Sequence, residues 1–295
     1  MGDNQPVYPI RAAAELTGVN PVTLRAWERR YGLIRPERTA KGHRLYTEAD
    51  IARIRRILEL LDRGVLISRA REVLDAEASG QAVAAGEEPW PAWREHLDRV
   101  LARFDPGALA GALGELLSLY PVDRAASHIL LPALAERQRG DWDGVAEGYL
   151  LARYLRGRLG HLVYRQRPQG RGRNFLLAAP PGDGAPPTLA ETALCTLALA
   201  AIQVGHRPLL LGEGVPAPAI AAGARRGAAS AVLLYAGEAP EAAWHEAAAA
   251  LAAAGQPPLG ITGPGAGRPA ELPPGALALT GEPHEAIARL QAHCD

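Results

Sequence analysis

The sequence is poor in cysteine and in aromatic residues, and it has no long apolar segment. Its two cysteines, Cys195 and Cys294, lie far apart, without CxxC spacing and without a nearby histidine cluster. This pattern excludes a disulfide framework and a cysteine-based zinc module. A run of about 18 apolar residues is absent, and the N-terminal stretch lacks a charged-then-apolar leader. We therefore expect a cytoplasmic protein that is neither exported nor inserted in a membrane.

The usual signatures of catalysis and of nucleotide binding are also missing. Neither GxGxxG nor GxxxxGK(S/T) occurs, so phosphate-binding loops of these two kinds are excluded. Ser118, Ser127 and Ser230 lack the GxSxG context of a catalytic nucleophile. The histidines show no HxH or HxxxH spacing, and we expect them to be scattered rather than to bind a metal. The sequence predicts a protein that is not an enzyme and has no metal site.

The composition is that of a globular protein with an uneven distribution of charge. The 295 residues are 48% hydrophobic and carry 32 basic and 32 acidic side chains, and this length suits two or three domains. Residues 1–75 nevertheless hold 14 basic against 10 acidic side chains. A basic patch on a neutral chain is expected of a nucleic-acid-binding module. An ordinary solvated helix face would give the same pattern.

The segment 8–75 is dense in helix signals separated by short breaks. A short apolar-periodic helix is predicted over 10–16 and a second over 22–31, where Asn20 is placed to cap the second helix. Two short helices joined by a tight turn predict a helix-turn-helix. Residues 33–46 are interrupted by proline and glycine, so they predict a β-hairpin wing rather than a third helix.

The run TGVNPVTLRAWERRYGLIRPERTAKGHRLYTEADIARI resembles the MerR family of transcription regulators. Thr-Leu-Arg, an aromatic residue, Glu-Arg, Gly-Leu-Ile-x-Pro-x-Arg and Gly-His-Arg-x-Tyr occur in the order and spacing of that family's winged-helix domain. The resemblance covers about residues 6–75. It implies a dimer that binds an inverted repeat in promoter DNA and bends and untwists the promoter, so that RNA polymerase engages both of its elements.

The expected DNA contacts come from the second helix and from the wing. The N-terminal half of a recognition helix meets base edges, whereas most wing contacts position the protein on the backbone. The candidate DNA-binding residues are Thr23, Arg25, Trp27, Arg29, Arg30, Tyr31, Arg38, Lys41, His43, Arg44 and Tyr46. For Trp27, core packing is an open alternative. We expect Glu28 to pair with Arg25 or with a wing arginine, since phosphates repel a carboxylate that has no partner.

The rest of the chain is predicted to form two further domains. Residues 76–92 lose periodicity and form a first linker, and residues 93–164 read as four helices with short connections, which predicts a four-helix bundle. A second linker follows over 165–173. From residue 174 to 295 short apolar runs alternate with helices, which predicts a doubly wound, Rossmann-type α/β domain with ligands at the carboxyl ends of its strands.

A MerR-type domain followed by a bundle and such an α/β domain resembles the light-responsive, cobalamin-binding regulators of the CarH/LitR group. In that group Gly-Asp-x-His-x-x-Gly follows the first strand, and its histidine ligates cobalt. Here the loop reads Gly182, Asp183, Gly184 and Ala185, so alanine replaces the histidine. Imidazole is the ligand needed, so we expect no cofactor and no cobalamin bound through this loop. In lacking this histidine, the sequence resembles the MlrA-type regulators of curli and biofilm genes, whose cobalamin-binding fold is degenerate.

These observations predict a homodimeric transcription regulator whose C-terminal region serves dimerisation or sensing. Its expected partners are double-stranded promoter DNA and RNA polymerase, with a regulatory protein or a small-molecule effector as a further partner and no membrane. The alternative is a ligand-gated or light-gated sensor whose α/β domain holds a tetrapyrrole or cobalamin without the usual histidine. A nucleotide second messenger near Arg165–Arg173 is the other ligand considered.

Overall fold

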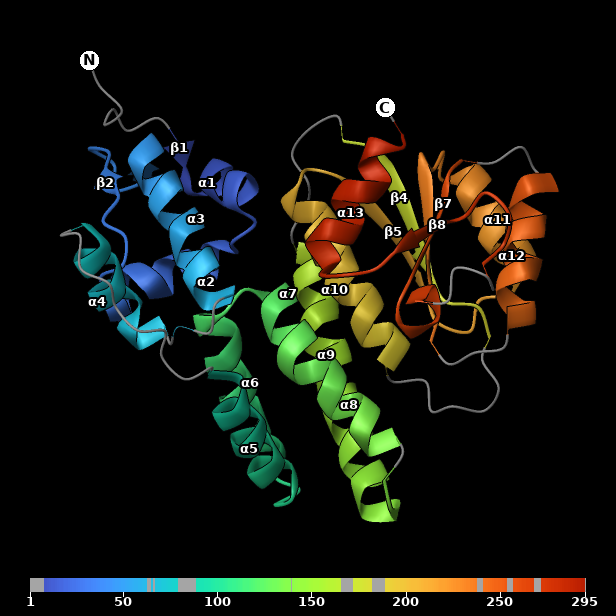
Figure 1. The fold of residues 1–295 in the computed structure, drawn as a ribbon, viewed down its shortest axis with the longest axis horizontal. Helices are drawn as coiled ribbons and strands as arrows, with labels where there is room; N and C mark the ends of the chain where they lie inside the picture. The colour runs from blue at the N-terminus through green and yellow to red at the C-terminus, as the bar shows by residue number, and fades with distance from the viewer. Residues whose placement is uncertain are drawn as a thin grey trace. The chain divides into compact units, whose positions relative to one another are not determined.

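The computed structural model describes residues 8–62, 65, 67–78, 89–138, 140–165, 172–181, 189–237, 241–253, 257–267 and 272–294. The chain divides into two compact units, unit 1 (Met1–Ala125) and unit 2 (Ala126–Asp295). Figure 1 shows the helices and strands of each. Among the described residues, no helix is both long enough and apolar enough to cross a membrane.

Unit 1 begins with a winged helix-turn-helix. Its elements are β1 (Tyr8–Pro9), α1 (Ile10–Thr17), α2 (Pro21–Ala26), the π-helical segment η1 (Trp27–Tyr31), β2 (Glu37–Arg38), β3 (Arg44–Tyr46), α3 (Glu48–Asp62) and α4 (Ile67–Ala78). The Asn20 side chain accepts a hydrogen bond from the Val22 backbone N–H at 2.7 Å, which caps α2. Strands β1 and β2 both pair antiparallel with β3. The predicted helices and hairpin wing are confirmed.

Three more helices complete unit 1: α5 (Pro89–Leu101), α6 (Pro106–Leu119) and α7 (Val122–Ala125). The Asp105 carboxylate caps α6, because it accepts hydrogen bonds from the backbone N–H groups of Gly107 and Ala108 at 2.7 and 3.2 Å. Helix α6 packs against α5 and against α2. The helix-turn-helix therefore shares its core with a helix that comes much later in the chain.

Unit 2 joins a helical segment to a parallel sheet. Its elements are η2 (Ala126–Leu130), α8 (Leu131–Gln138), α9 (Trp142–Arg165), β4 (Asn174–Ala178), α10 (Leu189–Gln203), β5 (Arg207–Gly212), α11 (Ala217–Arg226), β6 (Ala231–Tyr235), α12 (Glu241–Ala253), β7 (Leu259–Thr262), η3 (Pro264–Gly267), β8 (Leu277–Leu279) and α13 (Pro283–Ala292). The strand order is β5-β4-β6-β7-β8, and every pair is parallel. The predicted doubly wound sheet is confirmed.

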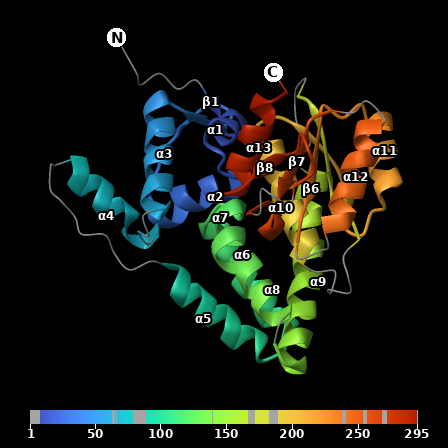
Figure 2. The same cartoon turned by 45° about the vertical axis from the view of Figure 1, so that its right-hand side comes forward.

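Helices cover both faces of this sheet. Helices α11 and α12 lie on one face and α10 and α13 on the other (Figure 1, and Figure 2 after a turn of the molecule). All five residues of β6 are buried, as expected of a central parallel strand, which is covered on both sides and therefore reads as a continuous apolar run. On the α11 and α12 face, Leu176, Val232 and Leu234 of the strands pack with Trp244 of α12.

The predicted four-helix bundle over 93–164 is not confirmed. Helices α5, α6 and α7 belong to unit 1, whereas η2, α8 and α9 belong to unit 2. Helix α9 packs against α8 and against α10 of the α/β region, so it extends the covering layer of the sheet. Most of the predicted linkers 76–92 and 165–173 lies outside the described residues.

Candidate nucleic-acid interface and ligand pocket

The helix-turn-helix and the wing together expose a group of basic side chains. On α2 and η1 the exposed candidates are Arg25, Arg29 and Arg30, with Tyr31 half-buried beside them. In the wing, Arg38, Lys41 and His43 are exposed and Arg44 is half-buried. Arginine offers a planar fork of donors that matches phosphate oxygens and guanine edges. The exposed candidates therefore have the chemistry that a DNA surface requires.

Three candidates have buried side chains, and their assignment as direct DNA contacts is corrected. Thr23, Trp27 and Tyr46 are each 0% exposed. The Trp27 indole N–H donates to the backbone carbonyl of Leu119 at the end of α6, at 2.8 Å. Of the two interpretations of Trp27, core packing is the one that the structure supports. The partner lies 92 residues away in the chain, so no local pattern could have identified it.

Glu28 ties the second helix to the wing. Its carboxylate accepts a hydrogen bond from Arg38 at 2.9 Å and another from Nε of Arg44. Burial by itself would raise the pKa of the Glu28 carboxyl, but the hydrogen bonds from Arg44 and Arg38 outweigh that effect and lower the pKa below its ordinary value. The expected pairing of Glu28 with a wing arginine is confirmed, and it involves two arginines rather than one.

The tip of the wing is a tight turn between β2 and β3. The Thr39 backbone N–H donates to the His43 carbonyl at 2.8 Å, and the Gly42 N–H donates to the Thr39 carbonyl at 2.8 Å. Gly42 has a φ of 80°, a value that side chains with a Cβ rarely adopt. Lys41, the only lysine of the sequence, is exposed at this tip. The turn therefore holds a cation at the outer end of the hairpin.

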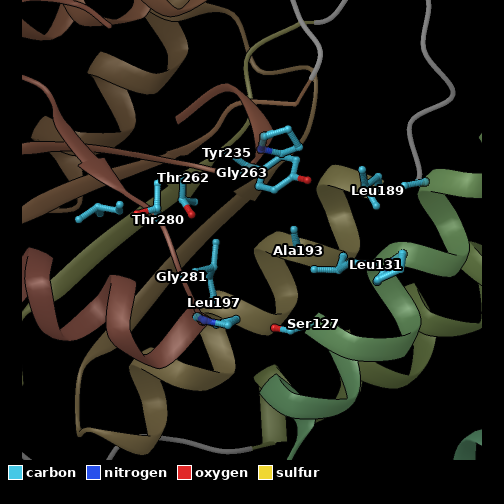
Figure 3. Close-up of a pocket in the computed structure, with 15 residues that line it drawn as sticks. Ser127, Leu131, Leu189, Ala193, Leu197, Tyr235, Thr262, Gly263, Thr280 and Gly281 are labelled. Atoms are coloured by element: carbon cyan, nitrogen blue, oxygen red, sulfur yellow. The ribbon is translucent and has the colours of Figure 1, made fainter. Parts of the chain in front are cut away.

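Unit 2 contains a pocket at the carboxyl ends of β6, β7 and β8. Its volume is about 480 Å³. Tyr235, Thr262 and Thr280 follow or end these strands, and Figure 3 shows Ser127 and Leu131 on the helix opposite them. The remaining lining residues are Pro132, Ala135, Leu189, Ala193, Leu197, Gly263, Pro264, Leu279, Gly281 and Pro283. The expectation of a site at the carboxyl ends thus coincides with a cavity, although its lining residues were not predicted.

The pocket combines apolar walls with a few hydroxyl groups. Burial raises the pKa of the Tyr235 phenol to about 12, so this group is neutral at physiological pH. Ser127 donates a hydrogen bond to the Glu282 carboxylate at 2.7 Å. Glu282 also caps α13 in a reciprocal arrangement with Glu285. A carboxylate therefore already occupies the N-terminus of the helix that follows the pocket.

A second group of titratable side chains lies where α10 meets the end of β5. Burial raises the pKa of the Glu213 carboxyl to about 7, and the charge of Glu191 adds to this effect while Arg156 opposes it. Nε of Arg156 lies 3.8 Å from the Glu191 carboxylate. Burial raises the pKa of the Cys195 thiol to about 12, so this cysteine is a protonated core residue rather than a nucleophile.

The predicted degenerate loop Gly182, Asp183, Gly184 and Ala185 lies outside the described residues. Of the described histidines in unit 2, His206 is buried and stacks on Phe175 with 4.4 Å between the ring centroids. Both residues stand at the amino ends of β4 and β5. They are therefore at the edge of the sheet opposite the pocket.

The sequence comparisons give concordant matches. Residues 8–77 match the family described as MerR HTH family regulatory protein. The chain is 35% identical over 221 residues to the HTH-type transcriptional repressor CarH of Myxococcus xanthus, covering 71% of this chain and 72% of CarH. It is 30% identical to the repressor CarA of the same organism, covering 72% of this chain and 70% of CarA. These relatives are transcription regulators, in line with the expectation that the chain is not an enzyme.

Two further likenesses cover less or are weaker. The HTH-type transcriptional regulator MlrA of Escherichia coli K12 is 36% identical over 129 residues, which cover 43% of this chain and 50% of MlrA. A crystal structure of a cobalamin-binding protein from Desulfitobacterium hafniense DCB-2 covers 68% of this chain and 97% of that protein, with 14% identity and a TM-score of 0.34. This structural likeness is too low to carry an argument.

Proposed function

Because the chain belongs to the MerR family of helix-turn-helix transcription regulators, we propose that it binds an inverted repeat in promoter DNA as a homodimer and distorts the DNA between the half-sites. A single small winged domain buries too little surface for tight specific binding, which favours two copies on two half-sites. A protein can act through base pairs that it does not touch when it deforms the duplex. RNA polymerase is then the partner that responds to the altered promoter, in the cytoplasm.

The exposed basic side chains of unit 1 carry this proposal. Arg25, Arg29 and Arg30 follow one another along the second helix, and the wing adds Lys41 and His43. Glu28 forms ion pairs with Arg38 and Arg44 and so links the wing to the second helix. We assign to the half-buried Tyr31 a contact with a sugar or a phosphate beside them.

We assign the C-terminal region to dimerisation or sensing, without cobalamin bound through a histidine. Cobalamin is the cofactor that the resemblance to the CarH/LitR group implies, and the residues do not fit histidine ligation at the expected edge of the sheet. The sequence 182–188 contains no histidine, and the buried His206 lies beside Phe175 at the amino ends of the strands. The alternative, a light-gated or ligand-gated regulator, predicts visible absorbance in the purified protein or after incubation with adenosylcobalamin in the dark.

The test is a pair of arginine variants measured on DNA. Operator fragments are first selected by the full-length protein from random-sequence duplexes, and affinity is then measured at several salt concentrations. Arg30→Ala should weaken binding about tenfold at low salt. It should also reduce the slope of log affinity against log salt concentration by about one, the change expected for the loss of one phosphate contact. Arg225→Ala, at an exposed arginine on α11 of unit 2, is the matched control and should change neither the affinity nor its salt dependence. Unchanged affinity of Arg30→Ala at low salt would refute the proposed surface.

A further inference from the structure

The pocket of unit 2 presents hydroxyl groups that the protein itself leaves without partners. Within the part of the chain that the structure describes, the side-chain hydroxyls of Tyr235, Thr262 and Thr280 make no hydrogen bond, although all three residues line the pocket. Tyr235 and Thr262 are buried and Thr280 is exposed, and a hydroxyl gains about 0.5–1.5 kcal/mol from a hydrogen bond that replaces one to water. Three such groups at the ends of three neighbouring strands converge on one cavity, as polar groups do in ligand sites.

The charge around the pocket disfavours an anionic ligand. None of the described lining residues is charged. The nearest carboxylate in sequence, Glu282, lies between the lining residues Gly281 and Pro283 and accepts the hydrogen bond of Ser127. Since Glu282 also caps α13, the helix N-terminus that would otherwise attract an anion is already satisfied. A phosphate or a carboxylate would meet no lysine or arginine among the described lining residues, and it would lie close to the Glu282 carboxylate, which also lies 3.7 Å from Nε2 of His128.

The size and the walls of the pocket select a compact apolar molecule. A volume of about 480 Å³ lies in the range of about 300–1,000 Å³ that holds drug-sized ligands. Leu131, Leu189 and Leu197 offer apolar contacts from α8 and α10, and Tyr235 offers the face and edge of a ring (Figure 3). Aromatic rings stack well on such a side chain.

We propose that this pocket binds an uncharged, mostly apolar ring compound, whose one or two polar atoms hydrogen-bond with Tyr235, Thr262 and Thr280. This ligand class differs from a tetrapyrrole and from a nucleotide second messenger, because the described lining residues include no histidine, cysteine or carboxylate that could bind a metal and no lysine or arginine. The proposed ligand site uses residues of unit 2 alone. Its test is therefore independent of the test of the proposed DNA surface on unit 1.

The first experiment compares two fluorescent probes that share one skeleton. N-phenyl-1-naphthylamine is uncharged, and 8-anilino-1-naphthalenesulfonate carries the same rings with a sulfonate. On the full-length protein the neutral probe should bind saturably with a stoichiometry of one, and the sulfonate should bind at least tenfold more weakly. Equal or tighter binding of the sulfonate overturns the inference, and so does non-saturable uptake of the neutral probe.

The second experiment places the probe in the pocket. Ala135→Leu adds apolar volume at a half-buried lining position of α8 and should weaken the neutral probe at least tenfold. Ala222→Leu, at a half-buried position of α11 that does not line the pocket, should leave its binding unchanged. Leu189→Trp fills the pocket from α10 and serves if the first variant does not fold. If neither variant that fills the pocket weakens binding of the neutral probe, the proposed site is wrong. If the protein takes up adenosylcobalamin in the dark and Ala135→Leu abolishes this uptake, the proposed ligand class is wrong.

Discussion

The pKa values of partly buried acidic groups are shifted in opposite directions in the two units of the chain. In unit 1, Glu28 sits under the wing, and hydrogen bonds from Arg44 and Arg38 hold its pKa below the ordinary value despite burial. In unit 2, burial and the neighbouring charge of Glu191 raise the pKa of Glu213 to about 7, and Arg156 offsets this only in part. A carboxyl keeps its charge where the fold surrounds it with cations and loses it where the fold does not.

This difference teaches which kind of partner each unit suits. In unit 1, two arginines neutralise the Glu28 carboxylate, and further arginines remain exposed on the same surface. This surface therefore suits a polyanion such as DNA. A pocket whose described lining residues are apolar or carry hydroxyl groups suits an uncharged molecule. The pH dependence of stability at Glu213 and at Glu28 tests this contrast, and the loss of Trp27 measures the contribution of packing in unit 1.

The largest expected effect tests whether the second helix of unit 1 is held by its apolar side or by its charged side. Trp27→Ala removes a fully buried indole and its hydrogen bond to the Leu119 carbonyl. The free energy of unfolding of unit 1 should fall by about 3–5 kcal/mol. Urea unfolding followed by circular dichroism measures this. Trp142→Ala, at a side chain that is 88% exposed, is the control and should change stability by about 0.5 kcal/mol or less.

A smaller effect concerns the carboxyl of Glu213 in unit 2, whose pKa is raised. The folded pKa of Glu213 is raised from its ordinary value of 4.5 to about 7, so between these pH values the folded chain binds a proton that the unfolded chain has released. Stability should therefore fall as pH rises from 4.5 through 7. The shift corresponds to ~3 kcal/mol, which solvent screening at a half-exposed carboxyl reduces to roughly 1–2 kcal/mol.

Glu213→Gln should flatten this pH dependence, because glutamine stays neutral throughout. Urea unfolding of unit 2 at pH 5 and pH 8 measures the slope. Glu246→Gln, an exposed position on α12, should leave the slope as it is. A wild-type protein equally stable at both pH values would break the contrast between the two units.

The smallest effect has the opposite sign and belongs to Glu28. Because its folded pKa is lowered, its stabilising contribution is present above the ordinary pKa of 4.5 and is lost as pH falls through the folded value. Glu28→Gln should cost about 1 kcal/mol at pH 7 and less at pH 3, which lies below the ordinary pKa of 4.5. Glu37→Gln, an exposed neighbour in β2, is the control. An equal loss at both pH values would show that Glu28 acts through packing rather than through its charge.

Local patterns were sufficient to predict much of the fold. Asn20 before Pro21 marks the start of α2, because an N-cap and a first-turn proline act within a few residues. The buried strands of unit 2, such as Ala231–Tyr235, were predicted because a short continuous apolar run between two helices is typical of a strand that is covered on both faces. These features depend on residues close in sequence.

Features that depend on distant contacts were predicted poorly. The buried Trp27 indole has its hydrogen-bond partner at Leu119, 92 residues away. The division of the expected bundle depends on which helices α6 and α9 pack against. The pocket is assembled from η2, α8, α10 and three strand ends, and no single segment has a motif for it. Glu28 was an exception, because electrostatics alone requires a cationic partner for a carboxylate on a DNA-binding face.

The exposed turn of the wing makes the protein a natural substrate for a protease that cuts after lysine. Lys41 is the only lysine in the sequence and stands at the tip between β2 and β3. Such a protease has one cleavage site in the whole chain, within an accessible turn of the kind that proteases prefer. Cleavage into two fragments after residue 41 would show that the wing is accessible in the free protein. Slower cleavage in the presence of operator DNA would show that the DNA covers the wing.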